Sequence, residues 1–187
     1  MDIIGKKLTV PQFRELVSGF NFGRIKPNSI VVHHTAVPTK EQWRGAASIA
    51  GLKRYYEGKG WSAGPHLFVG EDGIWLFTPM TDVGIHAAEG NATWVRNGVQ
   101  YKGFRGPAGC QLKDYSIGIE VVGNYDRELW DGETKKNALY AIKGLMQRLG
   151  IGKDRIFFHR DFPTARKSCP GWAITKPWLY QLLDQTP

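Results

Sequence analysis

The chain has 187 residues, a length that suits one domain with a substantial buried core. Its composition, 42% hydrophobic and 22% charged, is that of an ordinary globular protein and argues against intrinsic disorder, and no stretch approaches the run of about 20 apolar residues that a membrane span needs. A net charge of +8 fits an anionic partner such as a cell wall, or a plain basic surface with no dedicated partner; the lack of a dense Lys/Arg tract disfavours nucleic acid.

Hydrophobic periodicity and turn residues divide the chain into alternating helices and strands. The first half predicts helices over about 9–20 and 41–58, a buried strand over 30–32, and a hairpin of strands 66–70 and 74–78. The second half predicts a long surface loop over 88–114, strands over 116–122 and 155–158, and helices over about 133–149 and 175–184. This interleaving predicts a single α/β domain over residues 1–187, with a central mixed β-sheet flanked by helices.

Histidines stand just past the ends of two predicted strands. His33 and His34 follow the strand 30–32, and His159 follows the strand 155–158. Open sheets place their functional sites at strand ends, so we expect a shared site in a surface groove there. Adjacent strand residues face opposite sides, so only one of His33 and His34 should reach it. The alternative is a pair of partly exposed histidines without a ligand.

The two cysteines, Cys110 and Cys169, lie in different settings. The start of the chain lacks the apolar core of a secretory signal, so we expect a product made in the cytoplasm, where a disulfide is disfavoured. Cys110 then reads as a plain loop or core residue. Cys169 shares a short polar segment with His159, and two imidazoles with one thiolate can hold Zn²⁺ with the fourth position open, as catalytic zinc sites do. The alternative is an incidental cysteine in a basic surface loop.

Two charged residues could act beside such a metal. Glu120 interrupts the apolar strand 116–122, on the face of Gly118 and Val122. A carboxylate there must be paired, open to a cleft or raised in pKa, which fits a general base and a structural salt bridge equally well. Lys167 shares a face with Cys169 in an extended segment, where it could stabilise an oxyanion and the thiolate.

Six segments in this order resemble the zinc-dependent N-acetylmuramoyl-L-alanine amidases of the peptidoglycan-recognition superfamily, which includes phage endolysins. The resemblance covers about residues 28–182 and leaves 1–27 as an N-terminal extension. The segments are Ile30–Ala36, Gly64–Val69, Glu71–Gly73, His86–Ala87, Ser116–Glu120 and His159–Gly171.

The resemblance implies a role for each candidate residue. His33, His159 and Cys169 correspond to the zinc ligands, Glu120 to the catalytic base and Lys167 to the lysine that contacts the reacting carbonyl. The implied reaction is zinc-dependent hydrolysis of the amide between N-acetylmuramic acid and L-alanine in peptidoglycan.

The implied substrate groove includes further residues. His86 corresponds to a histidine that lines the groove. The loop 88–114 would form one wall, where Trp94 and Phe104 could stack on sugar or stem peptide, although anchoring the loop is the commoner use of such residues.

One position departs from the family pattern, because Pro65 stands where many members carry a tyrosine that assists the zinc water. This shifts the expected base role onto Glu120. We expect a monomeric endolysin of a phage or prophage, made without a signal peptide and released to the wall through a membrane lesion. The alternatives are a cytoplasmic muropeptide-recycling amidase, a peptidoglycan-binding module without turnover, and a nucleic-acid-binding protein with a structural zinc.

Overall fold

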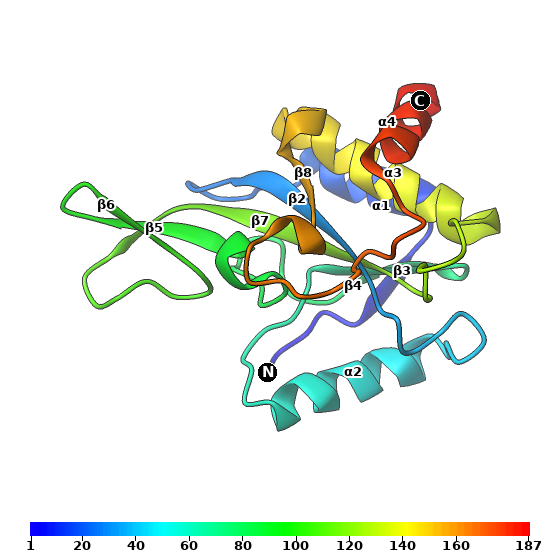
Figure 1. The fold of residues 1–187 in the computed structure, drawn as a ribbon, viewed down its shortest axis with the longest axis horizontal. Coiled ribbons are helices and arrows are strands. Elements are labelled where there is room, and N and C mark those ends of the chain that lie inside the picture. Colours follow the sequence, from blue (N-terminus) through cyan, green and yellow to red (C-terminus); the bar gives the residue numbers. More distant parts are fainter.

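A mixed eight-stranded sheet forms the centre of the protein in a computed structural model that describes all 187 residues (Figure 1). The strands are β1 (Lys6–Leu8), β2 (Pro27–His34), β3 (Leu67–Gly70), β4 (Gly73–Leu76), β5 (Ala92–Arg96), β6 (Val99–Lys102), β7 (Gln111–Val121) and β8 (Ile156–Phe158). The helices are α1 (Val10–Gly19), α2 (Ala46–Gly58), α3 (Gly132–Leu149) and α4 (Lys176–Gln185). The predicted α/β class and flanked mixed sheet are confirmed.

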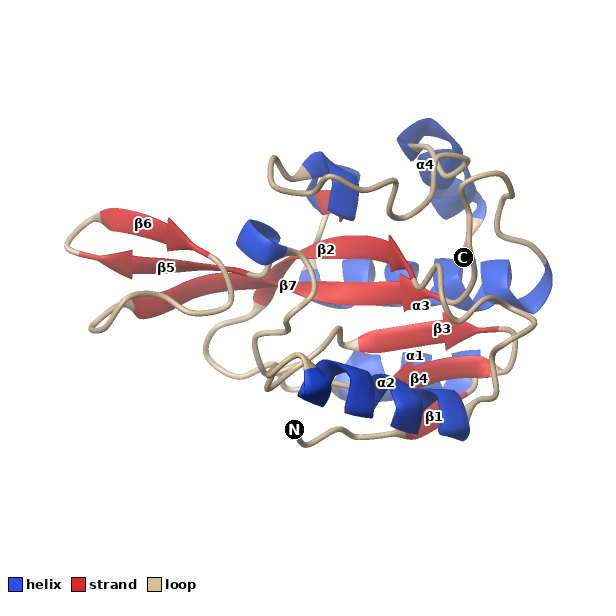
Figure 2. Ribbon diagram, turned by 60° about the horizontal axis from the view of Figure 1, so that its bottom comes forward, coloured by secondary structure: helices blue, strands red, loops and turns tan.

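Strands β8, β2, β7 and β3 are parallel neighbours in this order, and β4 and β1 continue the sheet in antiparallel pairing. Helices α1, α3 and α4 cover one face, while α2 lies on the other (Figures 1 and 2). Parallel strands covered on both faces read as continuous apolar runs, which explains the sequence Ile30-Val31-Val32.

The strand β7 divides its side chains between two cores. Ile117, Ile119 and Val121 belong to the large core under α1, α3 and α4. Val122, the residue directly after the strand, packs with Phe68 in the smaller core on the side of α2. The alternation predicted for this strand is therefore confirmed, and it directs the intervening position 120 toward the α2 side of the sheet.

Residues 88–114 are not the long surface loop that the sequence predicted. They contain β5, β6 and the first part of β7, and form an antiparallel arm that extends beyond the body of the domain (Figure 2). Asn97 and Gly98 join β5 to β6 with φ of 51° and 78°, the left-handed conformations that a two-residue hairpin turn requires. Strand β7 starts at Gln111, not at 116 as predicted from the sequence. The irregular part of the arm is the segment between β6 and β7, residues 103–110, which we call the return segment.

Two further boundaries differ from the prediction. Helix α2 begins at Ala46, not at about 41, because Gly45 adopts φ 52° and ψ −121°, which no helix can contain. Strand β1 was not predicted, since three residues are too few to show a period; it pairs with β4 and is followed by α1, capped at Thr9. The first 27 residues are thereby built into the same sheet and core as the rest.

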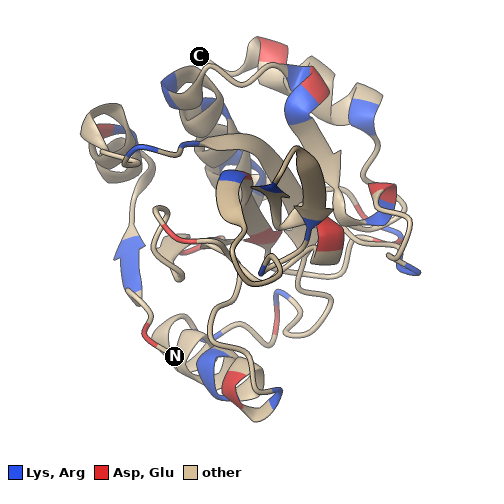
Figure 3. Cartoon of the chain, turned by 90° about the vertical axis from the view of Figure 1, so that its left-hand side faces the viewer, with Lys and Arg blue, Asp and Glu red and all other residues tan.

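None of the four helices combines the length and the apolar character that crossing a bilayer requires. The basic residues are spread over helices, strands and loops, with Asp and Glu among them on the face shown in Figure 3.

Candidate metal centre and catalytic pocket

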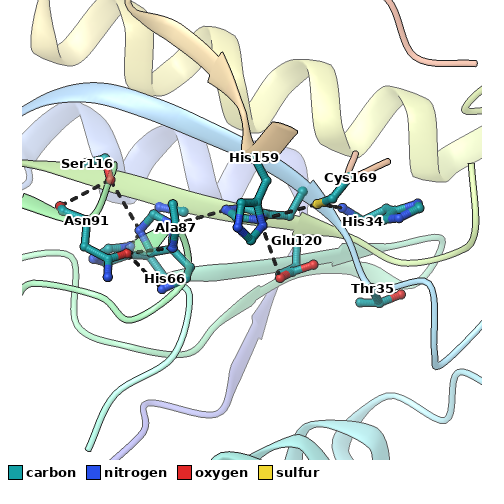
Figure 4. A network of polar contacts seen from close by, with 12 residues as sticks. His34, Thr35, His66, Ala87, Asn91, Ser116, Glu120, His159 and Cys169 are labelled. Atoms are coloured by element: carbon teal, nitrogen blue, oxygen red, sulfur yellow. Dashed lines mark hydrogen bonds and ion pairs between the residues drawn. The ribbon is translucent and has the colours of Figure 1, made fainter. Parts of the chain in front are cut away.

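The candidate residues meet where parallel strands end. His33 lies near the carboxyl end of β2, directly opposite Glu120 of β7 in the register. His159 follows the last residue of β8 and opens a short 3₁₀ helix (His159–Asp161). Cys169 comes from the loop beyond it, and its sulfur points toward the strand ends (Figure 4). These side chains therefore meet at the carboxyl ends of the parallel strands, where the sequence predicted the site.

Three side chains converge on one point. Nδ1 of His33 lies 3.1 Å from Nδ1 of His159 and 3.5 Å from Sγ of Cys169, and all three ligand atoms lie within 4.8 Å of one another. His34 turns away: its Nδ1 accepts a hydrogen bond from the backbone N–H of Tyr125 at 3.1 Å. The backbone N–H of His34 donates to Sγ of Cys169 at 3.4 Å, which helps to aim the sulfur.

The spacing of the three atoms fits a tetrahedral zinc ion. With zinc bonds of ordinary length, the N–N and N–S edges of the tetrahedron would be about 3.4 and 3.6 Å. The two separations from Nδ1 of His33, 3.1 and 3.5 Å, are close to these edges, and the third pair, His159 and Cys169, lies within 4.8 Å. Two imidazoles and one thiol are the ligand types that zinc prefers, and three protein ligands leave one position for water or substrate.

The protonation states of His33, His159 and Cys169 favour binding of a cation. Burial, together with neighbouring positive charges, lowers the pKa of His33 well below 6.5 and that of His159 to about 4. Burial also raises the pKa of the Cys169 thiol, and the Glu120 charge adds to this effect. Both imidazoles are therefore neutral at neutral pH, with lone pairs available to a metal. A bound cation would favour the thiolate.

Glu120 lies beside the cluster, with Oε1 at 3.9 Å from Nδ1 of His33. Its other oxygen, Oε2, is buried without a hydrogen-bond partner. Burial raises the pKa of Glu120 to about 8, and the positive charge of Lys167 opposes this shift. A carboxylate with a raised pKa and an uncommitted oxygen is suited to accept a proton near neutral pH.

A cavity of about 790 Å³ opens above these residues. Its floor holds the cluster and Glu120, and the exposed Lys167 stands at its edge. Residues of α2 and the following turn form one wall, and the segment after β2 forms another. The lining residues that sequence reasoning missed include Val37, Leu52, Tyr55, Tyr56 and Trp61. In the sequence, Ser48, Leu52 and Tyr55 follow a helical spacing of three and four residues, which could have predicted that they share one face of the helix.

Trp94 and Phe104 lie outside this cavity. Nε1 of Trp94 donates to the carbonyl of Gly103 at 3.1 Å, and its ring packs so closely on Gly106 that a Cβ there would lie 2.7 Å away. Phe104 lies under the guanidinium of Arg105, 5.1 Å from the ring centre. The structure thus does not bring these aromatic residues to the candidate site, and Trp94 anchors the return segment of the arm.

His66 is completely buried, and both nitrogens of its ring form hydrogen bonds with backbone groups. Nδ1 accepts the backbone N–H of Gly118 at 2.9 Å, and Nε2 donates to the carbonyl of Asp82 at 3.0 Å. Burial lowers its pKa from 6.5 to about 4. The unfolded chain therefore binds a proton at His66 more readily than the folded chain does between these two values.

We expect His66 to make the protein sensitive to acid. Its contribution to stability is complete above pH 6.5 and is lost as the pH falls toward 4, by about 3 kcal/mol in total. Urea unfolding from pH 7.5 to 4.5, with a chelator present throughout, should give a shallower pH dependence for His66→Gln than for the wild type. Equal slopes for the two proteins would contradict this assignment.

Arg160 holds the loop that carries Cys169. One guanidinium nitrogen donates to the carbonyls of Ser168 and Gly171 at 2.9 and 2.7 Å, and another donates to that of Ile174 at 2.5 Å. A planar fork is needed to reach carbonyls at three places of one loop, and a lysine does not have one.

We expect Arg160→Lys to lower the free energy of unfolding by about 2 kcal/mol, because backbone carbonyls lose charged donors. Arg166→Lys, an exposed change in the same segment, serves as the control and should change it by less than about 0.5 kcal/mol. Urea denaturation of the two variants measures the difference, and equal midpoints would exclude this role for Arg160.

Comparisons with known proteins identify the family and the fold of the chain. A family model described as N-acetylmuramoyl-L-alanine amidase matches residues 23–172. The fold is similar to the endolysin amidase LysCS from Clostridium intestinale, with 21% identity, a TM-score of 0.58, and 86% of this chain and 85% of that chain covered.

Two further solved structures share the fold. Drosophila PGRP-LB has 18% identity and a TM-score of 0.55, over 91% of this chain and 86% of that chain. AmpD has 19% identity and a TM-score of 0.56, over 84% of each chain. A search of curated protein sequences finds no significant match.

Proposed function

The chain belongs to the N-acetylmuramoyl-L-alanine amidase family, and from this premise we propose that it is a zinc-dependent peptidoglycan amidase. Its substrate bond is the amide between the lactyl group of N-acetylmuramic acid and L-alanine of the stem peptide. The observation that carries the proposal is the convergence of His33, His159 and Cys169 beside the uncommitted oxygen of Glu120.

His33, His159 and Cys169 would hold the metal. Zinc, when bound, supplies a Lewis acid that lowers the pKa of water and polarises a carbonyl. The observation that supports zinc is the donor set itself, with neutral imidazoles and a sulfur at separations close to tetrahedral edges.

Glu120 is the proposed general base. Its carboxylate takes the proton of the attacking water while the new C–O bond forms at the lactyl carbonyl carbon. When the C–N bond breaks, the same carboxyl group returns the proton to the amine of L-alanine. Pro65 offers no proton-transferring group, and it lies outside the cavity. The base role therefore goes to Glu120.

Lys167 is the proposed electrostatic partner of the reacting carbonyl. It has no ion-pair partner in the protein, it is exposed at the cavity edge, and its charge reaches Glu120, His33, His159 and Cys169. An ammonium group in this position favours the oxyanion that develops on the lactyl carbonyl, and loss of such a donor typically costs about 10²–10³ in turnover.

The experiment is mass spectrometry of purified peptidoglycan after incubation with the protein, with zinc and with a chelator. Stem peptides with a free L-alanine amino terminus, formed only in the presence of zinc, support the proposal. Intact peptidoglycan with zinc bound to the protein would instead indicate a binding module without turnover.

We further propose that the biological role is that of a phage or prophage endolysin. The net charge of +8 supports it, since an anionic wall attracts a basic enzyme. Intact sacculi and soluble muropeptides, compared at equal enzyme concentration, test the role. Faster cleavage of sacculi fits an endolysin, whereas exclusive cleavage of soluble muropeptides would identify a recycling enzyme.

A further inference from the structure

A chain of polar contacts leads away from the three-residue cluster through His86. Nδ1 of His86 lies 3.1 Å from Nε2 of His33, and Nε2 of His86 lies 3.3 Å from Oγ of Ser116. Oγ of Ser116 donates in turn to the carbonyl of Gly90 at 2.6 Å. Ser116 lies at the end of this network opposite to Cys169 (Figure 4).

The hydrogen bond from Ser116 to Gly90 decides which atom donates in each of the other hydrogen bonds of the chain. The carbonyl of Gly90 can only accept, so the single hydroxyl hydrogen of Ser116 points to it. Oγ of Ser116 then accepts from Nε2–H of His86. A neutral imidazole carries one N–H, so Nδ1 of His86 is an acceptor and takes Nε2–H of His33. Nδ1 of His33 is left without hydrogen.

A histidine that ligates a metal does so through the lone pair of a neutral ring. In neutral rings the tautomer decides which nitrogen donates, so the contacts of His86 and Ser116 select the tautomer of His33.

We propose that His86 and Ser116 are positioning residues for the metal, which hold His33 as its Nε2–H tautomer with the Nδ1 lone pair aimed at His159 and Cys169. The inference rests on the zinc site of the proposed function and extends it from the ligands to the groups that orient them. It also changes the role of His86. His86 lines the cavity, as expected from the sequence, but both of its ring nitrogens are engaged within the protein, so they support a ligand and are not free to bind substrate.

The backbone fixes the place of the His86 ring. Gly118 of β7 leaves the space for it, since a Cβ at that position would lie 2.5 Å from Cγ of His86. The side-chain oxygen of Asn91 accepts the backbone N–H groups of His86 and Ala87 at 3.0 and 2.7 Å. A glycine inside an apolar strand is the sequence signature of such a close approach.

Zinc affinity, measured by competition with a chelator of known affinity, is the first test. We expect Ser116→Ala to weaken zinc binding about 10–100-fold. Ser29→Ala is the matched control, because Ser29 is also buried and lies opposite Ser116 in the register of β2 and β7. An affinity within twofold of the wild type for Ser116→Ala would overturn the proposal.

A double-mutant cycle separates positioning from general damage to the fold. If Ser116 acts through His86, then Ser116→Ala has no further effect on zinc affinity in a His86→Leu background. Additive losses in the double variant would contradict the relay.

Tautomers can also be read directly in the zinc-free protein. Two-bond ¹H–¹⁵N spectra of histidine-labelled wild type at neutral pH should show Nε2–H at both His33 and His86, and Ser116→Ala should allow His86 to populate both tautomers. Nδ1–H at His33 in the zinc-free wild type would overturn the proposal. This readout requires neither zinc nor turnover, so a protein with these tautomers but without amidase activity would reject the proposed function alone.

Discussion

Replacement of Cys169 by serine is expected to abolish zinc binding and amidase activity together. Serine keeps an acceptor for the backbone N–H of His34, so the loop should stay in place, but a neutral hydroxyl is a poor zinc ligand. Metal analysis of the purified protein should fall from about one equivalent of zinc to none, and no free L-alanine amino termini should form from peptidoglycan.

The second cysteine provides the control for this experiment. Cys110 lies in the arm, outside the cavity, and Cys110→Ser should retain zinc and turnover. Circular dichroism and thermal unfolding of both variants exclude a general loss of structure. A Cys169→Ser protein with a full equivalent of zinc and normal turnover would remove Cys169 from the metal site.

Replacement of Glu120 by glutamine should reduce turnover about 10²–10⁴-fold while zinc stays bound. The amide has nearly the shape of the carboxyl group but cannot accept the proton of the attacking water. The rate of peptide release from sacculi at saturating zinc measures the effect. Glu133→Gln, a surface change at the start of α3, should leave the rate unchanged. Near-normal turnover in Glu120→Gln would exclude Glu120 as the general base.

The same substitution should stabilise the zinc-free protein at neutral pH. The folded state holds the Glu120 proton more tightly, with a pKa of about 8 against the ordinary value of 4.5 for an exposed glutamate. Stability from this group is therefore complete below pH 4.5 and is lost as the pH rises toward 8. With zinc removed by a chelator, Glu120→Gln should exceed the wild type by about 3 kcal/mol in urea unfolding at pH 7.5 and match it at pH 4.5. An unchanged difference at the two pH values would contradict the raised pKa.

These opposite effects on turnover and stability have one physical cause. A carboxylate without a hydrogen-bond partner in a buried position is costly to the fold, yet it is a stronger base for the same reason. The presence of Glu120 at such a position is consistent with use of the group in a reaction.

Much of the fold followed from patterns that are local in the chain. The run Ile30-Val31-Val32 and the alternation around Glu120 identified buried strands, because strand side chains alternate and parallel strands are covered on both faces. The arm was missed because most of its residues are exposed or only partly buried, so no two-residue hydrophobic period marks it; the Asn97-Gly98 turn was its one clear signal.

For the candidate site, too, some features could be predicted from the sequence and others depend on the folded structure. Residue types and the strand pattern were enough to select His159, Cys169 and Glu120 as candidates and to narrow the upstream ligand to His33 or His34, and the family resemblance then pointed to His33. Their mutual distances, the support of His33 by His86, and the loop contacts of Arg160 are visible only in the folded chain. His33 and His159 are 126 residues apart in sequence, and which ring nitrogen of His33 faces His159 depends on the space left by Gly118 and on the hydroxyl of Ser116. Local composition encodes which elements form, whereas the direction of a side chain is decided by the packing of segments that meet only after folding.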